Sequence, residues 1–147
     1  MKTIRIQSQP FDVNAEIEAL TKGRTDAGAV VTFSGHVRAD DGLSALSLEH
    51  YPGMTEREIA RHLDEAFERW PLIGATIIHL VGVLRPGDPI VLVAAVSTHR
   101  QAAFQAAEFL MDYLKTRAPF WKEEARGAKT SWVEGKASDE DAAKRWK

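Results

Sequence analysis

The stretch of sequence that decides the fold is residues 75–97, ATIIHLVGVL-RPGD-PIVLVAAVS. Its two apolar segments, residues 75–84 and 89–97, are rich in the β-branched side chains that favour strands. Between them, residues 85–88 hold the proline, glycine and aspartate that are typical of a tight turn. The stretch therefore predicts two apolar strands paired as an antiparallel hairpin.

Amphipathic helices are predicted on both sides of this hairpin. Residues 55–70 begin with Thr55 and Glu58 at the spacing of a capping box, and Pro71 ends the helix. Residues 98–117 begin with a second such pair, Thr98 and Gln101, and Pro119 forces the chain out of the helix. The apolar residues at helical spacing are Ile59, Leu63, Phe67 and Trp70 in the first helix and Ala103, Ala107, Leu110, Met111 and Leu114 in the second.

Shorter elements complete the chain. Alternating or β-branched stretches predict strands, and a further helix over residues 12–22 has Asp12 as its candidate cap. The charged tail, residues 138–147, fits a loose helix. The remaining predicted strands are 2–7, 28–37, 44–50, 120–125 and 131–134. This order predicts an α+β fold with a mainly antiparallel sheet and about three helices, within a single domain over residues 1–147.

Composition narrows the function classes. The 147 residues include 19 Lys and Arg against 21 Asp and Glu, and this net charge of −2 disfavours a protein that coats nucleic acid. A local basic pocket remains compatible with it. The chain has no cysteine, which excludes a disulfide, a thiolate metal site and a cysteine nucleophile. Without a signal-type N-terminus or an apolar run of membrane-spanning length, we expect a cytoplasmic protein with no membrane contact.

Cations and aromatics gather in residues 115–124, KTRAPFWKEE. Lys115 ends the predicted helix and Lys122 follows a proline-led turn, so that both ammonium groups could line one cavity and bind an anionic substrate. A lysine in such a place can transfer protons or attack a carbonyl group. Alternatively, Lys115 complements the helix dipole and Lys122 lies on a solvated strand face. Spacing alone favours this second interpretation.

Two further cationic pairs are candidate anion sites. His99 and Arg100 lie at a predicted helix start, where backbone N–H groups and a guanidinium can bind phosphate or carboxylate. An exposed first helical turn explains them equally well. His36 and Arg38 share one strand face beside the loop 39–42. For this pair, an ordinary edge strand is the favoured explanation.

Other motif classes are absent from the sequence. The scattered histidines lack ligand spacing, and no dinucleotide, P-loop or nucleophile-elbow pattern occurs, so we expect no bound metal and no cofactor. Binding of single-stranded nucleic acid through the FWK segment is a remote alternative, because no matching motif accompanies it.

Longer strings make the chain recognisable. They are GAVVTFSGHVR (28–38), LEHYPGMTE (48–56), RWPL (69–72), IHLVGVLRPGD (78–88), STHRQAAFQAAEFLMDYLKTRAPFWKEE (97–124) and SWVEGKASDEDAAKRW (131–146). Together they resemble the MoaE family, the large catalytic subunits of molybdopterin synthase. The resemblance runs from about Pro10 to the C-terminus.

The resemblance implies an α/β hammerhead fold and a homodimer at the centre of a heterotetramer. It implies a small ubiquitin-like sulfur carrier of the MoaD type at each end, whose C-terminal Gly-Gly tail enters a pocket as a thiocarboxylate. Two sulfurs would pass to cyclic pyranopterin monophosphate to form the dithiolene of molybdopterin. The family thus implies a sulfurtransferase of molybdenum cofactor biosynthesis.

The resemblance also assigns roles to positions. Lys115 and Lys122 match the two lysines most closely tied to activity. Arg38, His99 and Arg100 match anion-binding positions, while the remaining matches are pocket positions at His36, Val37, Glu123 and Glu124, and pocket-wall positions at Phe33 and Met111. His36 stands where relatives often carry lysine, and Lys136 stands where some carry arginine.

These matches suggest a division of labour. Arg38, His99 and Arg100 would anchor phosphate and carboxylate groups, Lys115 would assist attack at the carrier's terminal carbonyl, and Lys122 would orient the substrate or transfer a proton. The alternative function is a non-catalytic module that binds the tail of a ubiquitin-like carrier.

Overall fold

The computed structural model describes residues 1–127, 129–132 and 137–146. Within them it contains two sheets and four helices, and thus confirms the predicted α+β class. In chain order the elements are β1 (Lys2–Gln7), α1 (Val13–Thr21), β2 (Ala29–His36), β3 (Ala45–His50), α2 (Met54–Arg69), β4 (Leu72–Leu80), β5 (Gly82–Leu84), β6 (Pro89–Ser97), α3 (Arg100–Thr116), β7 (Phe120–Arg126), β8 (Lys129–Trp132) and α4 (Ala137–Lys144).

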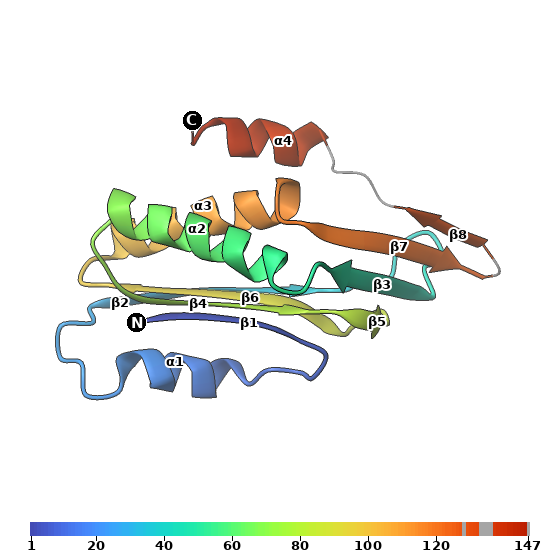
Figure 1. The fold of residues 1–147 in the computed structure, drawn as a ribbon. Helices are drawn as coiled ribbons and strands as arrows, with labels where there is room; N and C mark the ends of the chain where they lie inside the picture. Colours follow the sequence, from blue (N-terminus) through green and yellow to red (C-terminus); the bar gives the residue numbers. More distant parts are fainter. Residues whose placement is uncertain (128, 133–136, 147) are drawn as a thin grey trace.

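The first sheet has the strand order β1-β4-β6-β2 and the second has the order β5-β3-β7-β8. Only β1 and β4 run parallel to each other among the paired strands; every other described pair is antiparallel. In Figure 1 the second sheet extends from one end of the first, beyond the ends of α2 and α3. Strand pairing in the two sheets is thus mainly antiparallel, as the sequence predicts.

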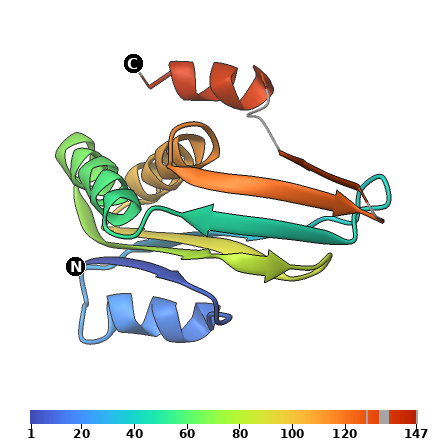
Figure 2. The same cartoon turned by 45° about the vertical axis from the view of Figure 1, so that its right-hand side comes forward.

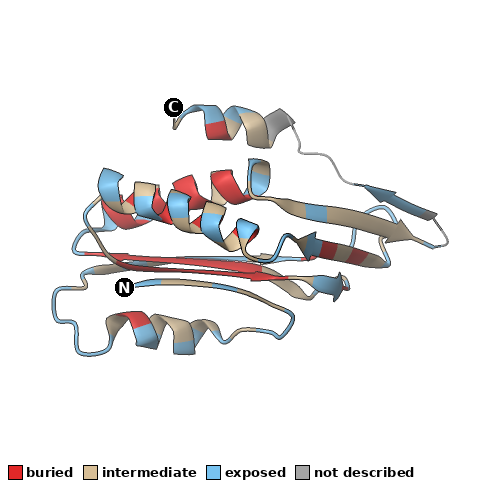
Figure 3. Cartoon of the chain, in the orientation of Figure 1, coloured by how far each residue is buried: buried red, intermediate tan, exposed pale blue. Residues whose placement is uncertain are grey.

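Helices cover both faces of the first sheet. Figures 1 and 2 show α1 on one face, α2 and α3 on the other, and α4 on the outer side of α3. Burial follows this layering, since β4, β6 and the inner sides of α2 and α3 hold the buried residues (Figure 3). The main core joins the two helices to the central strands, with Ile59, Leu63, Ile77, Val93 and Leu110 at most 1% exposed. No described helix is long and apolar enough to cross a membrane.

The predicted hairpin forms, but its first strand is divided. β4 and β6 pair antiparallel, with Ile77 opposite Val93. At Gly82 the backbone adopts a φ of +97°, a region that favours glycine, and the chain leaves the first sheet. Residues 82–84 then pair with β3 in the second sheet. The prediction of one strand over 75–84 was wrong at this point, because a single glycine redirects the backbone.

The two predicted capping boxes are also wrong. α2 begins at Met54, where Glu56 Oε1 accepts the N–H of Gly53 (3.0 Å). α3 begins at Arg100, and its N-cap residue His99 makes no side-chain capping bond. The predicted cap of α1 is confirmed, because Asp12 accepts the N–H of Ala15 (3.2 Å).

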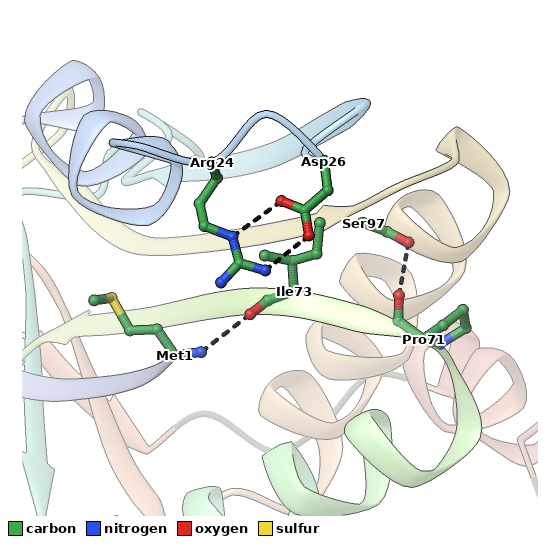
Figure 4. Close-up of polar contacts among 6 residues, drawn as sticks. All are labelled: Met1, Arg24, Asp26, Pro71, Ile73 and Ser97. Atoms are coloured by element: carbon green, nitrogen blue, oxygen red, sulfur yellow. Dashed lines mark hydrogen bonds and ion pairs between the residues drawn. The ribbon is translucent and has the colours of Figure 1, made fainter.

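Polar contacts tie the ends of the strands in the first sheet together. The ammonium group of Met1 donates to the carbonyl oxygen of Ile73 (3.0 Å), which fixes the start of β1 against β4 (Figure 4). Ser97 Oγ, at the end of β6, donates to the carbonyl oxygen of Pro71 (2.8 Å). These two bonds help to fix the alignment of the strands at this end of the first sheet.

Candidate functional site

A cavity of about 350 Å³ lies where α3 ends above the first sheet. Three layers of the fold contribute to it: strands β2, β4 and β6, the last turns of α3, and the first residues of β7. Its lining residues are Phe33, Ser34, Gly35, His36, His79, Ile90, Val91, Met111, Leu114, Lys115 and Lys122. Both candidate lysines therefore line one cavity, as the cavity interpretation of residues 115–124 requires.

The turn between α3 and β7 sets the relative positions of the two lysines. The N–H groups of Arg117 and Ala118 both donate to the carbonyl oxygen of Tyr113 (2.8 and 3.2 Å), which ends the helix. Thr55 Oγ1, fully buried at the start of α2, donates to the carbonyl oxygen of Pro119 (3.0 Å). β7 then starts at Phe120. Lys122 is two residues further along the strand, on the same face as Phe120, and lines the cavity.

The opposite wall is the end of β2. The register of β2 against β6 shifts between Gly35 and His36, which leaves Ile90 of β6 without a partner in β2, and both His36 and Ile90 line the cavity. A Cβ atom on Gly35 would lie 2.8 Å from Val91 Cγ1, so only glycine fits there without a shift of the wall. Ser34 Oγ lies 3.2 Å from His36 Nε2.

The electrostatic character of the cavity is cationic. Two lysines and two histidines line it, and no carboxylate does so among the described residues. One lining residue, His79, is only 4% exposed. Burial, together with smaller contributions from the charges of Lys122, Lys115 and His50, lowers the pKa of His79 to about 4. A small cationic cavity with an apolar floor is suited to an anionic group attached to an apolar or planar body.

Known proteins match the chain over most of its length. The sequence profile of the MoaE protein family matches residues 6–117. The molybdopterin synthase catalytic subunit of Mesorhizobium japonicum is 66% identical over 148 residues, which cover 99% of this chain and 93% of that protein. This chain belongs to the MoaE family. The resemblance found in the sequence is thereby confirmed.

Solved structures agree with this family assignment. The MoaE protein of Burkholderia ambifaria superposes with a TM-score of 0.86 at 48% identity, over 99% of this chain and 98% of that one. The molybdopterin synthase structure from Staphylococcus aureus has a TM-score of 0.82 at 34% identity, over 90% of this chain and 98% of that one. The fold is therefore that of solved MoaE structures.

Some of the site residues that the family resemblance predicts lie around the cavity, and others lie elsewhere. These residues come from β2, α3 and β7, three segments that are far apart in the sequence. The predicted residues that line the cavity are Phe33, His36, Met111, Lys115 and Lys122.

The two residues that follow His36 in this MoaE chain lie outside the cavity. Val37 is 4% exposed and packs in a separate core cluster with residues from both sheets, while its backbone bonds to Gly87 and Asp88. Arg38 is exposed and lies 3.5 Å from a carboxylate oxygen of Asp40. Within one chain, neither side chain lines the wall that contains the lysines.

His99 and Arg100 lie at the opposite end of α3 from Lys115. Lys115 comes fifteen positions after Arg100 in the helix, which corresponds to about 22 Å along the axis. Both residues are exposed and line a different hollow, together with Phe104. One copy of the chain therefore does not bring this pair to the lysines.

The predicted acidic residues follow Lys122 along β7 without lining the cavity. Glu123 is half-buried opposite Ser47, and Glu124 forms an ion pair with Arg126 (2.6 Å). Lys136 lies outside the described residues.

Sequence reasoning missed His79 as a cavity residue. In the sequence His79 is one of the scattered histidines, whose spacing does not suit a metal site. The signal was present in the strand pattern: alternation along β4 places His79 on the same face as Ile77, toward α2 and α3. A lone polar residue on the core face of an apolar strand indicates a position with a specific polar environment.

Proposed function

We propose that this chain is the catalytic subunit of a molybdopterin synthase. It transfers sulfur from the C-terminal thiocarboxylate of a small ubiquitin-like carrier to cyclic pyranopterin monophosphate. In each transfer the C–S bond to the carrier's last carbon breaks, and the oxygen of a water molecule replaces the sulfur, so that the carrier ends in a carboxylate. On the pterin side chain a C–O bond breaks as the new C–S bond forms, and the displaced oxygen leaves as water or stays with the phosphate. Two such transfers give the dithiolene of molybdopterin.

The convergence of Lys115 and Lys122 on one cavity carries this proposal, and no carboxylate in the described part of the chain lines that cavity. The thiocarboxylate and the phosphate are both anions, and two ammonium groups stabilise them in a partly enclosed space. The sulfur must arrive on a partner, because the chain has no cysteine to carry a persulfide.

The residue roles follow from this arrangement. Lys115 assists attack at the carrier's terminal carbonyl, and Lys122 orients the pterin or transfers a proton. Arg38, His99 and Arg100 bind phosphate and carboxylate groups; since His99 and Arg100 lie about 22 Å from Lys115 along α3, they serve the lysine cavity of a second copy.

The assembly belongs to the same proposal. Two copies of this chain form a central dimer, and a carrier of the MoaD type docks at each end. Residues 1–147 act as a single domain, and the complex works in the cytoplasm.

Turnover by lysine variants tests the proposal. The full chain is mixed with thiocarboxylated carrier and cyclic pyranopterin monophosphate, and molybdopterin formation is measured. We expect Lys115→Ala and Lys122→Ala each to lose about 100-fold or more in rate, the scale of a lost proton-transfer or charge-stabilising group. Lys22→Ala removes an exposed lysine beyond the end of α1 and is the matched control.

The possible results separate the alternatives. If both cavity variants keep activity within a few-fold of the wild type, the assignment of the lysines is wrong. If the wild-type chain binds the carrier but forms no product, the chain is a non-catalytic binding module.

A further inference from the structure

His79 is held in one orientation by contacts on two sides. Its Nδ1 lies 2.9 Å from the carbonyl oxygen of Leu80, and its ring stacks on that of Phe120 with centroids 4.0 Å apart and planes at 19°. A carbonyl oxygen can only accept a hydrogen bond, so Nδ1 carries the proton. In the neutral ring this leaves Nε2 unprotonated, with a lone pair.

The surroundings keep the ring in this neutral form. His79 is 4% exposed on the core face of β4, which disfavours a charged imidazolium. The charged or titratable groups that act on it are Lys122 from β7, Lys115 from α3 and His50 from β3, and His36 from β2 lines the same cavity. Each of these groups is cationic when charged, so each of them opposes a positive charge on His79.

The stacking contact also links His79 to Lys122 through the backbone of β7. Phe120 and Lys122 are two residues apart in the strand and therefore share one of its faces. The His79 ring thus contacts the face of β7 that carries the lysine, and both residues line the cavity. A neutral acceptor lies beside ammonium donors in a cavity that no carboxylate from residues 1–127, 129–132 or 137–146 lines.

We propose that His79 is a positioning residue of the sulfur-transfer site: its Nε2 accepts a hydrogen bond from the Lys122 ammonium group and holds it toward the substrate. The inference rests on the proposed function. A neutral acceptor orients the ammonium group without neutralising it, whereas a carboxylate at this place would cancel the charge that attracts the anionic substrates. This explains why an imidazole occupies a buried place on the core face of β4, where its neighbours Ala75 and Ile77 are apolar.

Two variants at His79 test the role in the full chain with its carrier. His79→Phe keeps a ring that can stack on Phe120 but has no acceptor, while His79→Gln restores a neutral acceptor. We expect kcat to fall about 10- to 100-fold in His79→Phe, the scale of a lost hydrogen bond to a charged group, and to recover at least in part in His79→Gln. We also expect the basic limb of the pH–rate profile to move to lower pH in His79→Phe, because an apolar neighbour stabilises an ammonium group less.

A second readout does not depend on turnover. In a chain labelled with ¹⁵N-histidine, the ring-nitrogen resonances of His79 should show a protonated Nδ1 and an unprotonated Nε2, and Lys122→Ala should shift the Nε2 resonance. A protonated Nε2, or an Nε2 resonance that Lys122→Ala leaves unchanged, overturns the inference. So does a His79→Phe chain that folds and keeps the wild-type kcat and pH profile. A wild-type chain without turnover refutes the proposed function instead, while the resonances still decide whether the hydrogen bond exists.

Discussion

Acidification should destabilise this chain through His79 well before its carboxylates are protonated. Burial and the neighbouring ammonium groups lower the pKa of His79 from the ordinary value of 6.5 to about 4 in the folded state. Above pH 6.5 the ring is neutral in both the folded and the unfolded chain. His79 therefore contributes no pH dependence to the free energy of unfolding in that range. Below pH 6.5 the unfolded chain binds a proton that the folded chain excludes, and the free energy of unfolding falls as the pH falls.

The size of this effect follows from the interval between the two pKa values. The free energy of unfolding changes by about 1.4 kcal/mol per pH unit while one state holds one more proton. From pH 6.5 to about 4 the loss is roughly 3 kcal/mol, after which both states are protonated and the slope vanishes. Small domains have about 5 to 15 kcal/mol of stability, so this loss is a large share.

The assay is urea unfolding at a fixed protein concentration between pH 7.5 and pH 4.5, for the wild type and for His79→Gln. Other groups contribute to acid destabilisation, among them His62, whose pKa burial also lowers. The prediction therefore concerns the difference between the two slopes, which should approach about 1.4 kcal/mol per pH unit near pH 5. His99→Gln removes an exposed histidine and is the control. Parallel curves for the wild type and His79→Gln would refute the reasoning, whatever their absolute stabilities.

Three substitutions test contacts of the helices that cover the first sheet. Tyr113→Phe removes a buried hydroxyl group that has no hydrogen-bond partner among the described residues, so thermal unfolding should show no loss and up to about 1 kcal/mol of gain. Thr55→Val removes the bonds to Tyr51 N–H and Pro119 O and should cost about 1 to 3 kcal/mol in urea unfolding. Trp146→Ala removes two edge-on ring contacts, which are worth about 1 to 3 kcal/mol together, and should speed limited proteolysis within α4.

Much of the fold could be predicted because its signals are local. The apolar hairpin, the helical spacing of residues 55–70 and 98–117 and the proline that ends each helix depend only on neighbouring residues. The sequence does not predict that the chain leaves the first sheet at Gly82. The cause is the pairing of β5 with β3, a strand about 35 residues earlier in the chain. The capping boxes failed for a related reason. Thr55 uses its hydroxyl group for a tertiary bond to the residue 119 carbonyl, which competes with capping.

The site could be predicted only in part. The short turn between Lys115 and Lys122 indicates from sequence alone that the two could converge, and both do line the cavity. Arg100 lies in the same helix as Lys115, but no sequence motif conveys that the length of α3 keeps the two about 22 Å apart. His79 was missed because its significance depends on which side chains cover that face of β4, and these come from α3 and β7.

The position of the lysine pair is controlled from outside the segment that carries it. The Ala118–Pro119 turn receives a bond from Thr55 at the start of α2, and the residue after it stacks on His79 from β4. Residues of α2 and β4 thus contact the short connection between α3 and β7. A substitution at either contact should therefore move one ammonium group relative to the other while both lysines remain present. In the proposed mechanism activity depends on that relative position, so the residues that contact the turn belong to the functional structure of the site as much as the amines do.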